Sequence, residues 1–116
     1  MMTIRPSVCG MFHRAVELIG RRWTGAIIFL LLKSSARFAD LRAGIPGVTD
    51  RMLSERLHEL EIEGIVVRTV IPDTPVRVEY ALTEKGRALA GVVDSIGVWA
   101  HEWAGNSDEV VHVAGD

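Results

Sequence analysis

Four polar side chains between residues 49 and 64 have types and spacing suited to binding a nucleic acid. They are Arg51, Ser54, Glu55 and His58. An arginine can donate two hydrogen bonds to a guanine or bind a phosphate, a glutamate can accept from a cytosine amino group, and serine and histidine can bond bases or phosphates. Helical spacing puts the four near one side of a helix. The segment therefore predicts a helix that contacts DNA in the major groove.

A helix that presents these side chains needs an apolar opposite face and defined ends. Leu53, Leu57 and Leu60 follow the i, i+4, i+7 spacing of a buried face. Thr49 can cap the first turn, where free backbone N–H groups also suit a phosphate. Gly64 can end the helix in the left-handed conformation. The alternative is an ordinary amphipathic surface helix, which this segment taken alone fits as well.

Several charged residues of this helix have competing roles. Glu55 can accept from cytosine, or it can pair with Arg51 one turn earlier and orient it. Arg56 lies off the exposed centre and is expected to pair with a nearby carboxylate rather than contact bases. The second half of the helix is acidic and must stay clear of DNA. Its acidic residues are Glu59, Glu61 and Glu63.

Other elements must position this helix. Periodicity predicts three preceding helices, near residues 10–19, 24–32 and 38–43. Gly and Pro at 44–47 predict the turn into the fourth helix. A β-hairpin should follow, with strands at residues 65–70 and 76–80 around a Pro-bounded loop. Residues 36–38 can add a brief strand at its edge, and Thr83 is expected to cap a single last helix.

The helix at 10–19 and the last helix carry wider apolar stripes than one small core needs. Exposed apolar patches of this kind usually mark an association surface, and large aromatic residues favour an interface. We therefore expect a symmetric homodimer. Its interface is expected to contain Met11, Phe12, Ala15, Leu89, Val93, Ile96, Trp99 and Trp103. The alternative is that both helices close the core of a monomer.

Length and composition indicate one globular domain. The chain has 116 residues, 48% hydrophobic and 24% charged, with a net charge of −2. Residues 1–80 carry 11 Lys and Arg against 9 Asp and Glu, whereas residues 81–116 carry 2 against 6. This asymmetry suggests that the first part meets a polyanion. We expect a flexible arm at 1–8, the folded domain at 9–104 and a polar tail at 105–116.

The sequence also argues against a membrane span, export, an internal disulfide and a thiolate-rich zinc site. The longest apolar run, residues 25–32, is far shorter than the roughly 20 residues of a membrane span. No apolar signal core follows Arg5, so we expect a cytoplasmic protein without a membrane partner. A single cysteine excludes an internal disulfide and a thiolate-rich zinc site. No cofactor and no bound metal are expected.

Several stretches of the sequence resemble a known family, the HxlR-type transcriptional regulators of bacteria, which are related to the MarR group. The likeness covers about residues 9–103, and no single motif decides it, but the set in this order is quite specific. The matching stretches are Cys9 with Ala15 ahead of LIGRRWT at 18–24, RFADL at 37–41, residues 53–64, and PVRVEYALTEKG at 75–86.

The resemblance implies a mostly helical α+β winged helix-turn-helix with a two- or three-stranded wing and terminal dimerisation helices. It implies a sequence-specific, DNA-binding transcriptional regulator whose dimer binds a palindromic operator in double-stranded DNA. The implied DNA-contacting residues are Thr49, Arg51, Ser54, Glu55, His58, Arg77 and Arg37. Arg77 would contact a phosphate or the minor groove from the wing.

The resemblance also suggests how a signal could act. Cys9 matches a cysteine that some members use as a thiol switch, although Gly10 stands where the family often has Pro. A one-domain dimer has no separate ligand module, so an oxidant or small molecule must act through Cys9 or through a pocket at the dimer interface. Ala39 replaces the Ser or Asn with which relatives commonly cap the third helix. That replacement is expected to cost about 1 kcal/mol.

Two rival classes of function follow from the residues. Cys9 with His13 one turn away could form a nucleophilic pair, but no third orienting residue accompanies them, and we expect no enzyme. His13 and Glu17 supply only two potential metal ligands. The negative net charge also allows a winged helix that binds protein instead of DNA, which is the main alternative.

Overall fold

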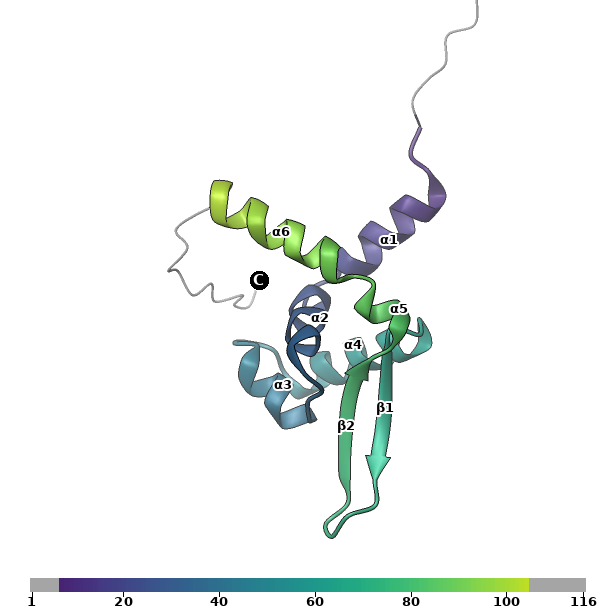
Figure 1. Cartoon of the computed structure of the whole chain (residues 1–116), viewed down its shortest axis with the longest axis vertical. Helices are drawn as coiled ribbons and strands as arrows, with labels where there is room; N and C mark the ends of the chain where they lie inside the picture. Colours follow the sequence, from purple (N-terminus) through teal and green to yellow (C-terminus); the bar gives the residue numbers. More distant parts are fainter. Residues whose placement is uncertain (1–6, 105–116) are drawn as a thin grey trace, which may run out of the picture.

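The computed structural model describes residues 7–104, which form a winged helix-turn-helix (Figure 1). Residues 1–6 of the predicted arm and all of the predicted tail at 105–116 lie outside the described residues. Residues 7 and 8 of the arm are exposed and belong to no helix or strand. The described elements are α1 (Gly10–Gly20), α2 (Thr24–Lys33), α3 (Phe38–Gly44), α4 (Asp50–Ile62), β1 (Val66–Ile71), β2 (Arg77–Leu82), α5 (Glu84–Arg87) and α6 (Ala90–Trp103).

The core lies between α2, α3, α4 and the base of the hairpin. Its fully buried side chains come from these helices and from the residue that leads into β1; they are Ile27, Ile28, Leu41, Leu53, Leu57, Leu60 and Ile65. Burying one such side chain contributes about 1.5–3 kcal/mol. The three leucines of α4 therefore fix the rotation of this helix, as its spacing predicted, and its polar side is left facing solvent.

The hairpin is a two-stranded antiparallel sheet. Its register runs from Val66 opposite Leu82 to Ile71 opposite Arg77. The expected edge strand at 36–38 is reduced to one bridge, in which Ala36 and Tyr80 exchange backbone hydrogen bonds of 2.9 and 2.8 Å. The hairpin projects from the core on the side away from α1 and α6 (Figure 1), as a wing does.

The prediction of one last helix is wrong, because the segment divides into α5 and α6. Thr83 does cap α5, since its hydroxyl oxygen accepts from the Gly86 N–H at 3.1 Å. A Cβ on Gly86 would clash with the Ile65 carbonyl oxygen and lie 3.0 Å from Leu82 Cδ2. The chain changes direction between α5 and α6 (Figure 1), and the two residues between these helices are Ala88 and Leu89.

The start of α3 also differs from its prediction. Ala39 is not the capping position, because it lies inside the first turn. The N-cap is Arg37, and its backbone N–H donates to the Asp40 carboxylate at 3.1 Å. An acidic residue in the first turn also interacts favourably with the helix dipole. Asp40 therefore supplies part of the stabilisation that a capping Ser or Asn would give.

The first and last helices are little supported by the core. Neither α1 nor α6 has a buried residue, and in Figure 1 they diverge at the end of the molecule opposite the wing. None of the helices described between residues 7 and 104 is long and apolar enough to cross a membrane.

Candidate nucleic-acid interface

The start of α4 is held by the turn that precedes it. Thr49 caps the helix, because its hydroxyl oxygen accepts from the Met52 N–H at 3.1 Å. Arg42 of α3 donates to the Val48 carbonyl at 2.8 Å and pairs with Asp50. The side chain of Val48 is buried. These contacts link α3, the turn and α4 into one unit.

The solvent side of α4 brings together the residues that the sequence singled out. The Arg51 side chain is 88% exposed, and its Nε lies 3.2 Å from Glu55 Oε1. Ser54 and His58 are exposed on the same helix. The predicted Arg51–Glu55 pair is therefore present, and it lies on the exposed side of the first turns of α4.

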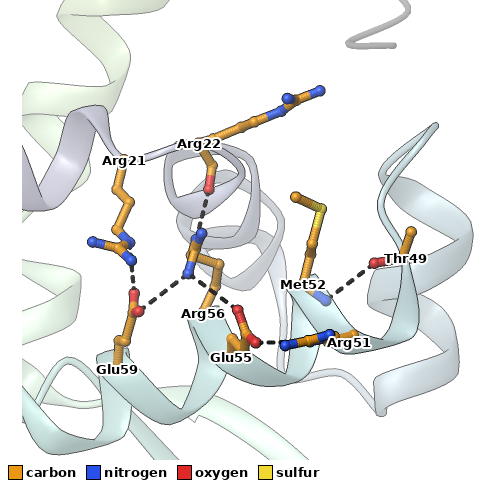
Figure 2. A network of polar contacts seen from close by, with 8 residues as sticks. All are labelled: Arg21, Arg22, Thr49, Arg51, Met52, Glu55, Arg56 and Glu59. Atoms are coloured by element: carbon orange, nitrogen blue, oxygen red, sulfur yellow. Dashed lines mark hydrogen bonds and ion pairs between the residues drawn. The ribbon is translucent and has the colours of Figure 1, made fainter. Parts of the chain in front are cut away.

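Arg56 and Glu59 turn away from this exposed side, as expected for Arg56. Its side chain is only 11% exposed. Its Nε donates to the Arg22 carbonyl oxygen at 3.1 Å, and its Nη1 lies 3.1 Å from Glu59 Oε2. Glu59 also pairs with Arg21 at 3.0 Å (Figure 2). One of the three acidic residues of the second half of α4 is therefore neutralised from inside the protein.

The two other cations expected to contact DNA lie on separate elements. Arg37 is exposed at the start of α3. Arg77 lies at the start of β2, with its guanidinium 3.3 Å from Asp73 and 3.9 Å from Glu79. Its Nε is buried without a hydrogen-bond partner. Arg77 is thus half-buried between carboxylates, and it must release Asp73 to reach a phosphate.

An apolar surface covers α1 and α6. Five of the residues expected at a dimer interface are strongly exposed: Met11 (72%), Phe12 (64%), Ile96 (53%), Trp99 (61%) and Trp103 (70%). Ala15 is exposed too, whereas Leu89 and Val93 are partly buried against the core. We call the exposed side chains of these two helices the terminal apolar face.

The sequence missed one member of this region. Phe29 of α2 is 49% exposed and lines an open groove of about 940 Å³ between α1, α2 and α6, together with Ile19, Gly25, Val93 and Ile96. The sequence did carry a signal for this exposed side chain. Residues 25–32 are apolar on every side of the helix, and the core of so small a domain cannot bury all of those sides. Periodicity could not say which side.

Cys9 is the N-cap residue of α1 and is exposed. The nearby backbone N–H groups of Phe12 and Met11, at the start of α1, lower the pKa of its thiol. The sequence had suggested His13 as a possible partner of Cys9, but His13 Nε2 instead lies 3.1 Å from Glu17 Oε1. Cys9 is thus an accessible thiol whose thiolate form is favoured by the helix start rather than by a base.

Residues 18–108 match the family model of the HxlR-like helix-turn-helix. The HTH-type transcriptional regulator YvaP of Bacillus subtilis (strain 168) is 51% identical over 96 residues, which cover 83% of this chain and 89% of the relative. YodB, an HTH-type transcriptional regulator of the same strain, is 42% identical over 104 residues, covering 90% of this chain and 93% of YodB.

Solved structures agree. The reduced form of YodB from B. subtilis superposes with a TM-score of 0.77 at 42% identity, covering 88% of this chain and all of that one. The redox regulator HypR in its reduced form gives a TM-score of 0.76 at 35% identity, covering 80% and 92%. YodB is also known in diamide-treated and quinone-bound forms, and HypR in an oxidised form.

The fold, the exposed polar side of α4 and the wing define a winged helix-turn-helix transcriptional regulator that binds DNA, not an enzyme. More particularly, the chain belongs to the HxlR-like helix-turn-helix family.

Proposed function

We propose that this regulator binds a palindromic operator as a homodimer, with the first half of each α4 in a major groove and each wing along the DNA backbone. The observation that carries the proposal is the contrast between the two sides of α4. Leu53, Leu57 and Leu60 are 0%, 1% and 0% exposed, whereas Arg51 is 88% exposed on the other side and held by Glu55. A two-fold dimer places two such helices about one DNA turn apart.

The terminal apolar face supports dimer formation. Its tryptophans and Phe12 are more than half exposed, and single soluble domains rarely expose contiguous apolar patches of that kind. Pairing α1 and α6 with a second copy would cover this face and leave both α4 helices accessible. The regulator would then work in the cytoplasm, where its operator lies.

We further propose that Cys9 responds to an oxidant or an electrophile. Its thiol is exposed and its pKa is lowered by the N–H groups of Phe12 and Met11, so that the thiolate is available to react. Joining two Cys9 thiols of a dimer would release two protons and pass two electrons to the oxidant. Addition to an electrophile would instead form one S–C bond without net oxidation. Either change would tilt α1 and alter the spacing of the two α4 helices.

Selection of genomic fragments tests the DNA-binding proposal. The purified protein is mixed with sheared DNA from its own genome, and the retained fragments are sequenced while sedimentation equilibrium gives the oligomeric state. We expect an inverted repeat among the retained fragments and a dimer in solution. A monomer that retains no DNA at low ionic strength would refute the proposal.

The thiol proposal has its own test. Operator binding of the wild type and of Cys9→Ser is measured before and after treatment with diamide or a quinone. We expect both proteins to bind when untreated and only the wild type to change its affinity on treatment. An equal response in both proteins would place the sensor elsewhere.

A further inference from the structure

A continuous set of polar contacts joins the exposed side of α4 to the junction between α1 and α2 (Figure 2). It starts at Arg51, which pairs with Glu55 at 3.2 Å. Glu55 Oε2 lies 4.0 Å from Arg56 Nη1. Arg56 continues to Glu59, and Glu59 to Arg21 at 3.0 Å. The residue expected to contact bases is thus linked to the end of the helix that carries Cys9.

Arg56 is the centre of this set. Its side chain is 11% exposed and bonds two partners, the Glu59 carboxylate and the Arg22 carbonyl oxygen 34 residues earlier in the chain. A planar guanidinium with donors in fixed directions can satisfy both partners only in a narrow range of helix positions. The contact with Arg22 therefore ties α4 to the α1–α2 junction.

The junction itself has a defined conformation. Trp23 is the one described non-glycine residue with a positive φ, at 77°, which is unfavourable for a large side chain. Its ring is 5% exposed and lies 4.8 Å below the Arg22 guanidinium. The strained residue is held by its packing, and the Arg22 carbonyl just before it is the acceptor used by Arg56. A change in the direction of α1 relative to α2 would therefore act on Arg22 and Trp23, which lie between the two helices.

Stability alone does not account for such a network. Only Arg56 is nearly buried, whereas Glu59 is 35% and Arg21 52% exposed, and ion pairs this accessible to water contribute little to stability. Buried ionic contacts are best attested where they select one geometry. A geometric role is therefore the better explanation for an arginine that is nearly buried beside a recognition helix.

We propose that Arg56, held by Glu59 and the Arg22 carbonyl, is a positioning residue that couples the direction of α1 to the placement of α4. This proposal rests on the proposed function, because it concerns how a dimer presents two α4 helices. Within one protomer, the network holds Arg51 through Glu55. Across the dimer, it sets the half-site spacing that the two α4 helices accept, and it carries a change at Cys9 to the DNA.

The test compares three duplexes: the selected inverted repeat, the same repeat with one arm scrambled, and the repeat with one base pair added between its arms. Wild type, Arg56→Met and Arg56→Lys are titrated against each. We expect Arg56→Met to lose about 2- to 30-fold on the intact repeat and much less on the single arm, and to discriminate less against the lengthened repeat. The affinities of Arg56→Lys should lie between those of the wild type and Arg56→Met, because lysine keeps the positive charge but lacks the forked set of donors of a guanidinium.

Glu59→Gln provides a second variant in case Arg56→Met does not fold. The amide keeps the shape of the side chain but removes the charge that pairs with Arg21 and Arg56, and we expect the same change in spacing preference. Glu61→Gln is the matched control: it alters charge equally on the same helix, outside the network, and should leave the preference unchanged.

The outcomes separate this proposal from the proposed function. A wild type that binds none of the duplexes defeats the proposed function itself. A wild type that binds, together with Arg56 and Glu59 variants that keep its affinities and spacing preference, overturns only the positioning role. An equal loss on the intact repeat and on the single arm would also overturn it, because that result describes a direct contact or general damage.

Discussion

At the scale of single residues, the Arg51–Glu55 pair shows how one side chain restricts the conformations of another. An exposed arginine samples many rotamers, and the ion pair with Glu55 at 3.2 Å restricts them. Exposed pairs of this type contribute little to stability, typically 0.3–0.5 kcal/mol. We therefore expect Glu55 to matter for the orientation of Arg51 rather than for the stability of the fold.

Removing Arg51 should weaken and broaden operator recognition. We expect Arg51→Ala to cost about 1–3 kcal/mol in operator affinity and to relax the preference at one base pair, with little change in thermal stability. Titration over a panel of single-base operator variants measures both effects. Glu55→Gln serves as the comparison and should give a smaller loss at the same base pair. Unchanged selectivity in Arg51→Ala would remove this residue from base recognition.

Cys9 makes a prediction about pH. The N–H groups of Phe12 and Met11 lower the pKa of its thiol, so the thiolate fraction should rise at lower pH in the folded protein than in the unfolded chain. We expect iodoacetamide to alkylate the folded protein faster at every pH below the pKa of the unfolded thiol, and the two rates to converge above it. The urea-unfolded protein is the control. Coincident pH profiles would show that the helix start does not activate this thiol.

At the scale of elements, α5 packs closely on the base of the hairpin. Gly86 lies against the Ile65 carbonyl oxygen, with Leu82 Cδ2 3.0 Å from an added Cβ. The backbone carbonyl cannot move aside cheaply, because Ile65 is 2% exposed and accepts a hydrogen bond from the Thr83 N–H at 3.0 Å. This contact joins α5 to the residue that leads into β1.

A methyl group at residue 86 should therefore loosen the whole domain. We expect Gly86→Ala to destabilise the protein by about 1–3 kcal/mol, the usual cost of overpacking, as measured by urea unfolding followed by tryptophan fluorescence. Gly91→Ala is the matched control, since nothing lies within 4 Å of its added Cβ and alanine favours a helix. A stability for Gly86→Ala equal to that of Gly91→Ala would contradict the close approach.

The elements also show what the sequence could predict. The spacing of Leu53, Leu57 and Leu60 predicted the buried side of α4, and β-branched runs predicted the hairpin, because these signals are local. The division of the last helix into α5 and α6 was missed, and α5 packs on the hairpin base through Gly86 and Ile65, which are distant in the sequence. Periodicity within residues 83–103 carries no trace of that contact.

The site was predicted in part for the same reason. Arg51 and Glu55 lie four apart on one helix, so their pairing follows from spacing. The Arg56 contact with the Arg22 carbonyl spans 34 residues, and the carboxylates around Arg77 depend on how the wing closes. The expectation that Arg56 would seek a carboxylate was right, but only the fold supplies the backbone acceptor. The assignment of residues to DNA contacts stays a prediction.

At the scale of the whole molecule, we expect the terminal apolar face to determine the oligomeric state. Trp99 is 61% exposed on α6. We expect Trp99→Glu to shift the protein toward monomer and to weaken binding to the intact inverted repeat, because a buried charge at an interface costs several kcal/mol. Sedimentation equilibrium and operator titration measure the two effects.

A charge placed elsewhere provides the control for this prediction. Ile62 is 71% exposed at the end of α4, outside α1 and α6. Ile62→Glu should leave the dimer intact in the same sedimentation experiment. If Trp99→Glu and Ile62→Glu sediment alike as dimers, the interface lies on another surface.

The absence of buried residues from α6 has a consequence for how long an unpaired copy survives. A helix of 14 residues with so little packing is marginal in water, so a lone protomer should fray at the end of α6 that carries Trp103 and expose it to degradation. Newly synthesised protomers would be degraded unless they dimerise, and nearly all of the regulator in the cell would then be dimeric. A pulse-chase at low expression, comparing the half-lives of wild type and Trp99→Glu, would reveal this: equal half-lives would disprove it.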